Sequence, residues 1–101
     1  MDELQQLTHF INKMVSDHRL KPVHISLSLA LCHSWITSRF QRSYRVSRKA
    51  LMKASRIRSM TTYHKVIREL QGFGYLKYFP SYHPVKASEV ELLNDSNHGN
   101  K

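Results

Sequence analysis

The sequence lacks several features that would place it in a common class of protein. It has one cysteine in 101 residues, so it cannot form an intrachain disulfide and is typical of a reducing compartment. No run approaches the roughly eighteen apolar residues of a membrane-spanning helix, so the chain is not expected to span a membrane. Residues 1–5 lack the basic and then apolar stretch of a secretory signal, which predicts a cytoplasmic location.

Acidic residues are also scarce, and they are unevenly distributed. Residues 18–68 contain no aspartate or glutamate but twelve lysines and arginines, and the whole chain has a formal net charge of +9. Basic side chains gain affinity for a polyphosphate by releasing its condensed counterions, and nearby carboxylates would oppose that gain. This segment favours an anionic partner, which could be a nucleic acid, a membrane surface or an acidic protein.

Two helices are predicted in the first part of the chain. In residues 2–18 apolar residues recur at spacings of three and four, as in an amphipathic helix, at Leu4, Leu7, Phe10, Ile11 and Met14. Residues 23–41 follow Pro22, and proline is favoured in the first turn of a helix. The apolar residues of this second helix form two sets, Ile25, Leu29, Cys32, Ile36 and Phe40, and Leu27, Leu31 and Trp35. Two apolar faces predict a central helix that is buried on both sides.

The next residues are predicted to form a short strand and then a helix-turn-helix. The strand is expected at residues 44–46, and Ser47 is a natural cap for a helix to about residue 54. The inward face of that helix is predicted at Ala50, Leu51 and Ala54. Residues 55–58 form a tight turn anchored by Ile57. Ser59 then caps a helix to about Gly72 whose core residues are Tyr63, Val66, Ile67 and Leu70.

A hairpin is predicted after this helix. Gly74 ends the helical run, as glycine often does just past a helix. Residues 75–79 and 88–93 alternate in the manner of strands, with a wing at residues 80–87 between them. We therefore expect an α+β winged helix-turn-helix of about four helices with a two- or three-stranded antiparallel wing. Residues 1–20 form its N-terminal helix, 21–93 the winged helix, and 94–101 a polar, disordered tail.

This plan assigns candidate DNA contacts, because the second helix of such a motif enters the major groove with its first residues on the base edges. The groove residues are predicted to be Ser59, Met60, Thr61, Thr62, His64 and Lys65. Phosphate or guanine contacts are expected from Arg48, Lys49, Lys53, Arg56, Arg58 and Arg68, and wing contacts from His83 and Lys86. Tyr63 is assigned to the core rather than to base stacking, and His64 could also be a bystander.

Catalytic and metal sites are not predicted. The adjacent pair Cys32 and His33 has no partners at the usual spacing of zinc ligands, and a tetrahedral site needs four. The sequence has no carboxylate pair for acid–base chemistry and no glycine-rich phosphate loop. We expect Cys32 in the core and His33 near the surface, and we expect neither an enzyme nor a cofactor.

The segment from Val23 to Leu93 resembles the winged-helix domains of bacterial transcription regulators and plasmid replication proteins. The resemblance lies in Ser59-x-x-Thr62-Tyr63-x-x-x-Ile67-x-Glu69-Leu70-x-x-x-Gly74-Tyr75-Leu76. A narrower likeness, to small winged-helix proteins of Bacteroidetes found among mobile-element genes, lies in His24-Ile25-Ser26-Leu27, Thr61-Thr62-Tyr63-His64 and Pro80-Ser81-Tyr82-His83-Pro84. The resemblance implies major-groove contacts in residues 58–65 and wing contacts in residues 81–86. In this chain Met60 stands where such helices often have a polar or basic reader, and the turn is one residue longer than usual.

The function predicted from these observations is sequence-specific binding of double-stranded DNA at the nucleoid, by helix 59–72 in the major groove and wing 80–87 on the backbone or minor groove. Transcription control is its expected purpose. One alternative is an accessory DNA-binding protein of a mobile element, acting in excision, transfer or replication. Another is a protein-interaction winged helix that docks an acidic partner. The N-terminal helix could form a homodimer through Leu4, Leu7, Ile11 and Met14, or pack on the protein's own core.

Overall fold

A computed structural model of the chain describes residues 2–81 and 87–93. Its helices are α1 (Glu3–Ser16), α2 (Pro22–Thr37), α3 (Arg48–Ser55) and α4 (Met60–Gly72), and its strands are β1 (Tyr44–Val46), β2 (Leu76–Phe79) and β3 (Ser88–Leu92). The predicted tip of the wing, with His83 and Lys86, and the predicted disordered tail lie outside the described residues. Within the described residues, no helix is both long enough and apolar enough to cross a membrane.

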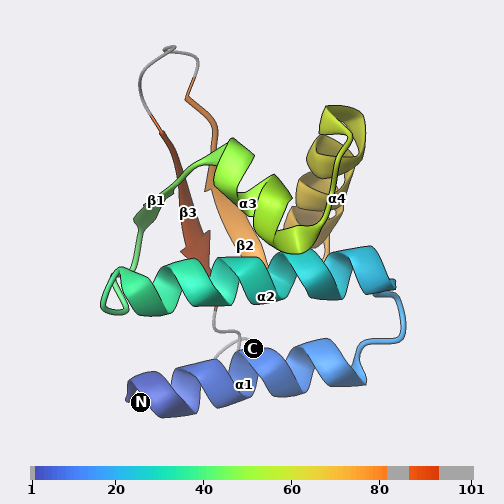
Figure 1. The fold of residues 1–101 in the computed structure, drawn as a ribbon. Coiled ribbons are helices and arrows are strands. Elements are labelled where there is room, and N and C mark those ends of the chain that lie inside the picture. The colour runs from blue at the N-terminus through green and yellow to red at the C-terminus, as the bar shows by residue number, and fades with distance from the viewer. Residues whose placement is uncertain (1, 82–86, 94–101) are drawn as a thin grey trace.

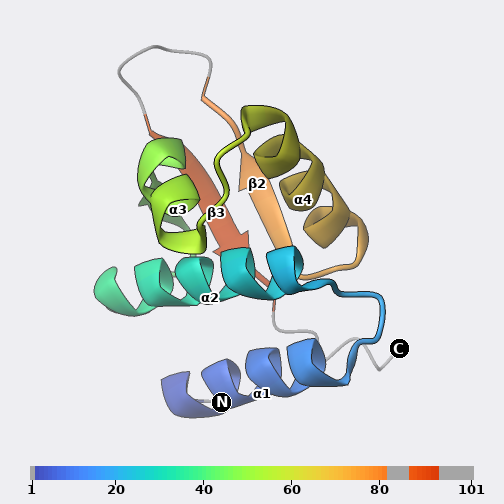
Figure 2. The same cartoon turned by 45° about the vertical axis from the view of Figure 1, so that its right-hand side comes forward.

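The elements have an α+β layout compatible with a winged helix. The three strands form one antiparallel sheet in the order β1-β3-β2. β3 is the central strand, and Val90 pairs with Tyr44 of β1 on one side and with Tyr78 of β2 on the other. Figure 1 shows α3, α4 and the sheet rising from one side of α2, while α1 lies along its other side. Figure 2 shows the same layers from a second direction.

The central helix α2 is buried on two sides, as predicted, but its exposed positions differ from the prediction. The buried residues of α2 are His24, Leu27, Ser28, Ala30, Leu31, Cys32 and Trp35. Leu29 and Ile36, which were expected on an inward face, are 50% and 42% exposed. Cys32 is buried and His33 is exposed, as expected, and burial raises the pKa of the Cys32 thiol to about 12.

The end of α2 was predicted incorrectly, because the helix stops at Thr37 and not near residue 41. Arg39 has the left-handed conformation, with φ 64°, and this turns the chain out of the helix. The Phe40 N–H then donates to the carbonyl of Trp35 at 2.9 Å. The two rings meet edge to face with centroids 4.9 Å apart. Glycine usually marks such an ending, and here an arginine occupies the position.

Helix α1 packs on the protein's own core. Phe10 and Met14 are buried, and the Phe10 ring meets the ring of Tyr75 edge to face at 5.6 Å. Lys13 Nζ donates to the carbonyl of Gly74 at 2.8 Å. Leu4, expected on the inward face, is 71% exposed. Since Met14 is buried in its own chain, the predicted dimer seam cannot use all four of its residues, and a homodimer stays a prediction.

A polar cluster fixes the loop after α1 to the end of α4. The Arg19 guanidinium bonds the carboxylate of Asp17 at 2.7 Å and 2.8 Å, and this holds the pKa of Asp17 well below its usual range although burial opposes the shift. The Tyr75 hydroxyl lies 2.9 Å from the same carboxylate. Arg19 also lies over the ring of Phe73 at 4.4 Å. The cluster keeps α1 and the start of β2 together.

Of two glycines near the end of α4, Gly74 has a backbone conformation that favours glycine and Gly72 does not. Gly74 has φ +87°, a conformation that costs a residue with a side chain about 1–2 kcal/mol. Gly72 is the last residue of α4, and a Cβ there would meet nothing within 4 Å. Alanine is favoured over glycine in a helix by roughly 0.5–1 kcal/mol.

We therefore predict that Gly74→Ala lowers the free energy of unfolding by about 1–2 kcal/mol. Gly72→Ala, the matched control, should leave it unchanged or raise it by up to about 1 kcal/mol. Urea denaturation of both variants measures the difference. Changes of the same sign at the two positions would contradict the left-handed ending assigned to Gly74.

Candidate nucleic-acid interface

Two serines begin the helices of the predicted helix-turn-helix. Ser47 Oγ accepts from the Ala50 N–H at 3.2 Å, and Ser59 Oγ accepts from the Thr62 N–H at 3.2 Å. Each hydroxyl satisfies one of the N–H groups that a helix start leaves without a partner. Both predicted caps are confirmed. The serines therefore fix the first residues of α3 and α4, which carry most of the candidate contacts.

The turn between α3 and α4 is held by its backbone and by α2. Arg56 has φ 64°, and the Ile57 N–H donates to the carbonyl of Met52 at 2.9 Å. Ile57 is buried, as predicted. From α2, Ser26 Oγ donates to the carbonyl of Ser55. The guanidinium of Arg56 donates to the carbonyl of Lys53 at 2.9 Å, so this side chain also caps α3.

Helix α4 has a buried face and an opposite, outward face. Its buried residues are Tyr63, Val66, Ile67 and Leu70, as predicted. Because successive residues turn by about 100° around a helix, the positions opposite these are Thr61, Lys65 and Arg68. All three are exposed. We call them the outward stripe of α4, and it carries two positive charges and a hydroxyl.

The edges of α4 are tied to its neighbours. On one edge Gln71 Oε1 accepts from the backbone N–H of Tyr78 in β2, at 3.0 Å. On the other edge Glu69 Oε1 lies 2.8 Å from His24 Nε2 in α2, and this contact lowers the pKa of Glu69. His24 Nδ1 accepts from the Lys21 N–H at 2.9 Å, so its Nε2 is the nitrogen that donates to Glu69. These contacts set the orientation of the outward stripe.

A chain of hydroxyl groups joins α4 to the base of the wing. The Tyr63 hydroxyl donates to the Tyr78 hydroxyl at 3.3 Å, and the latter donates to Ser88 Oγ at 3.2 Å. Ser88 Oγ also accepts from the Ser81 N–H at 3.3 Å. Burial raises the pKa of Tyr63, and the positive charge of Arg48 opposes that shift. No sequence pattern indicated the network, because it joins residues from α4 and both wing strands.

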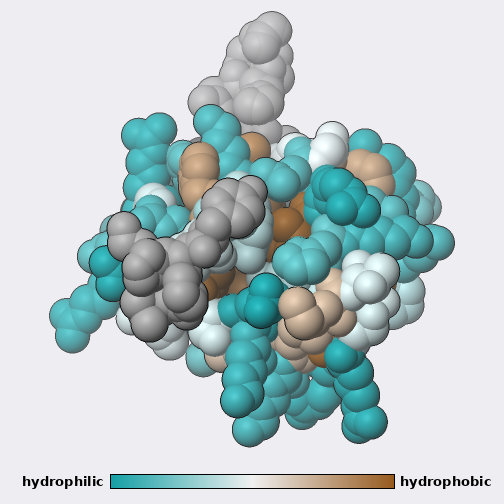
Figure 3. Space-filling view, turned by 90° about the horizontal axis from the view of Figure 1, so that it is seen from above, coloured by the Kyte–Doolittle hydropathy of each residue, from teal (hydrophilic) through white to brown (hydrophobic). Residues whose placement is uncertain are grey.

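The candidate residues on α3, the turn and α4 are almost all accessible. The exposed ones are Arg48, Lys49, Lys53, Arg56, Arg58, Ser59, Met60, Thr61, His64, Lys65 and Arg68, while Thr62 is half-buried. Ala50 and Ala54, predicted to face inward beside Leu51, are exposed instead. In Figure 1 the starts of α3 and α4 lie at the upper end of the molecule. Figure 3, viewed onto that end, shows a mostly hydrophilic surface around a smaller hydrophobic centre.

Four carboxylates of the described residues are bonded to side chains outside the outward stripe of α4. Asp17 bonds Arg19, and Glu69 bonds His24. In β3, Glu91 bonds Arg42 at 3.0 Å and Glu89 accepts from Ser43 Oγ at 2.9 Å. Helix α3 has no acidic residue, and α4 has only Glu69, outside the outward stripe. The field at the outward faces of α3 and α4 is therefore dominated by lysine and arginine.

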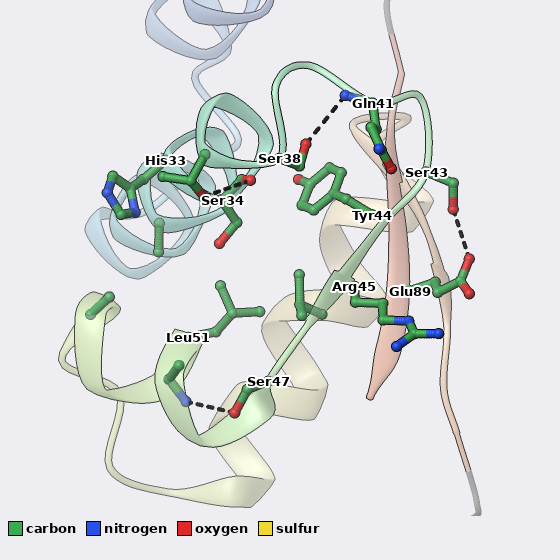
Figure 4. A pocket seen from close by; sticks show the side chains of 15 residues that line it. His33, Ser34, Ser38, Gln41, Ser43, Tyr44, Arg45, Ser47, Leu51 and Glu89 are labelled. Atoms are coloured by element: carbon green, nitrogen blue, oxygen red, sulfur yellow. Dashed lines mark hydrogen bonds between the residues drawn. The ribbon is translucent and has the colours of Figure 1, made fainter. Parts of the chain in front are cut away.

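A hollow lies between α2, α3 and β1 and has a volume of about 710 Å³. Ala50 and Ala54 line its α3 side, and their small side chains leave the space open. Figure 4 shows hydroxyl and amide groups around it, several of them already bonded within the chain. Ser38 Oγ, for instance, accepts from the Gln41 N–H at 3.2 Å.

Among the described residues, no group of three or more histidine, cysteine, aspartate or glutamate side chains could hold a metal ion.

Comparisons with known proteins identified no relative. No family model, no curated protein and no solved structure matches this chain. The assignment of a function therefore depends on the geometry and the charge of the surface itself.

The hydrogen bonds from Tyr63 to Tyr78 and from Tyr78 to Ser88 are expected to contribute to the stability of the fold. Tyr78→Phe leaves the buried hydroxyl of Tyr63 without its partner, which should lower the free energy of unfolding by about 1–3 kcal/mol. Tyr63→Phe leaves Tyr78 bonded to Ser88 and should lower it by only about 1 kcal/mol. Chemical denaturation of both variants and of the double variant measures the coupling between the hydroxyls. Additive losses in the double variant would show that the two hydroxyls do not interact.

Proposed function

We propose that the chain binds double-stranded DNA with the outward stripe of α4 in the major groove. The observation that carries the proposal is this stripe, in which Thr61, Lys65 and Arg68 are exposed on one face of a helix. The helix is capped at Ser59 and fixed to α2 and β2 by side-chain hydrogen bonds. A major groove about 12 Å wide admits an α-helix, and a rigid helix lets its side chains meet base edges in a fixed register.

The other basic residues fit contacts with the phosphate backbone. Arg48, Lys49 and Lys53 are exposed on α3, which precedes the reading helix. Side chains of this kind position a protein on the duplex without reading its sequence. Arg58 lies just before α4 and could reach either a phosphate or a guanine edge. The exposed lysines and arginines therefore divide into a reading group on α4 and a positioning group on α3.

Transcription control is the purpose we propose for this binding. The main alternative, an accessory role in a mobile element, uses the same surface and differs in the target. A palindromic site at a promoter would favour the regulator, since two copies of the chain would match a two-fold site. Clustered sites at the end of an element would favour the accessory role. A selection of bound sequences from random duplexes distinguishes these two roles.

The surface also predicts how binding depends on salt and on single charges. A variant that makes one phosphate interaction fewer should have a slope of log affinity against log salt that is shallower by roughly one. A random duplex offers no particular base to read, so Lys65 and Arg68 contribute to its binding through their charge. We therefore expect Lys65→Ala and Arg68→Ala to weaken binding to a random duplex and to flatten that slope. Fluorescence anisotropy at salt concentrations from about 50 to 200 mM measures both effects.

The matched control for these variants is Lys77→Ala. Lys77 is an exposed lysine of β2, where it pairs with Glu91 across the sheet and is not part of the outward stripe. Lys13 is unsuitable as a control because its ammonium group bonds Gly74 and lies over the ring of Tyr75. Affinity that does not respond to salt would refute DNA binding. Equal losses in all three variants would refute the assignment of α4 as the reading helix.

A further inference from the structure

An exposed apolar side chain interrupts the polar surface at the start of α4. Met60 is the first residue of the helix and is 49% exposed. Its sequence neighbours Arg58, Ser59 and Thr61 are polar and exposed. The other exposed large hydrophobic side chains of the described residues are Leu4, Val15, Leu29, Ile36 and Phe79, none of which lies on α3 or α4. Met60 is thus the one such side chain on the proposed reading helix.

Met60 is not part of the hydrophobic core. Met60 belongs neither to the buried core nor to the partly buried hydrophobic residues that pack against that core. The core residues of α4 begin with Tyr63, one turn later. Side chains of a helix tilt toward its N-terminus, so the thioether of Met60 extends past the first turn of α4. Met60 lies roughly 100° around the helix from the middle of the outward stripe, so it would meet the groove at the end of α4 and not along the stripe.

The chemistry of the groove limits what an apolar side chain can recognise there. Base edges in the major groove present hydrogen-bond donors and acceptors, and their apolar group is the C5-methyl of thymine. The same methyl group occurs on 5-methylcytosine, whereas cytosine and uracil lack it. A methionine is flexible and polarisable, so it adapts well to a small apolar group. A phosphate, by contrast, offers nothing to a thioether.

We propose that Met60 reads the C5-methyl group of a pyrimidine next to the start of α4. This inference rests on the proposed binding of DNA and adds a specificity determinant to it. Lys65 and Arg68 supply positive charge, while Met60 supplies discrimination between a methylated and an unmethylated pyrimidine. Thr61 is the neighbouring residue with a methyl group, and the experiment must separate the two.

The experiment uses the full chain and the duplex selected by it from random sequences. Each thymine is replaced in turn by deoxyuridine, which removes the methyl group and keeps the base pairing. One position should show a loss of affinity of roughly fourfold, the effect of one buried methyl group. Met60→Ala should bind the original duplex more weakly by a similar factor and should lose the sensitivity to deoxyuridine at that position. Its salt dependence should equal that of the wild type.

Thr61→Ser is the matched control, because it removes the methyl group of Thr61 and keeps the hydroxyl. Sensitivity to deoxyuridine should persist in this variant, and its loss there would assign the reading to Thr61 and overturn the proposal. Equal sensitivity in wild type and Met60→Ala, or no sensitive position, would also overturn it while DNA binding stands. Failure to bind any duplex would instead refute the proposed function, and the role of Met60 with it.

Duplexes that differ at the sensitive position show whether the methyl group belongs to thymine or to 5-methylcytosine. A duplex with 5-methylcytosine there should bind more tightly than the same duplex with cytosine, because only the methyl group differs. Tighter binding of the thymine duplex than of the 5-methylcytosine duplex identifies thymine as the preferred base, and the reverse order identifies methylated cytosine. Equal affinities for cytosine and 5-methylcytosine would contradict reading of the methyl group.

Discussion

Three helices of this protein end with the same backbone hydrogen bond, and the directions of the following elements depend on it. In each case the residue before the donor takes the left-handed conformation, as Phe40 itself also does, and the donor N–H bonds a carbonyl five residues back. The donors are Phe40, Ile57 and Tyr75, and the acceptors are Trp35, Met52 and Leu70. Each donor residue is buried or packed against the core. The chain is thereby turned from α2 toward β1, from α3 toward α4, and from α4 into β2.

The sequence predicted most of the elements because their boundaries have local causes. Ser47 and Ser59 cap their helices, and Gly74 marks the end of α4. The left-handed residues Arg39 and Arg56 carry no such signal, because arginine has no preference for that conformation. Their role follows from the burial of the next residue, which a single sequence does not reveal. For this reason the end of α2 was predicted too late in the chain.

The residues of the candidate site could also be predicted from local sequence patterns. The hydrogen bonds that hold the site in place could not. The exposure of Thr61, Lys65 and Arg68 follows from the helical period once the buried face of α4 is identified. The bonds from His24 to Glu69 and from Tyr63 to Tyr78 join residues far apart in the chain, so they required the packed structure. The exposure of Ala50 and Ala54 depended likewise on how α3 sits against α2.

The acidic and basic side chains of this protein lie largely on different parts of its surface. Four carboxylates of the described residues are bonded to Arg19, His24, Arg42 and Ser43, and of these only Glu69, whose pKa the charge of Lys65 also lowers, belongs to α3 or α4. An anionic partner would meet this surface without first displacing an internal ion pair. The packing of α1, through Phe10 and Met14, lies at the opposite side of α2 and leaves that surface free.

A backbone amide titration determines whether the proposed DNA-binding surface lies at the starts of α3 and α4. Spectra of isotope-labelled protein would be recorded by NMR as a short duplex is added at low salt. The largest shifts are expected at residues 48–49 and 58–68, with little change in α1. Shifts concentrated in α1 or around the hollow between α2 and β1, or no shifts at all, would contradict the proposed surface.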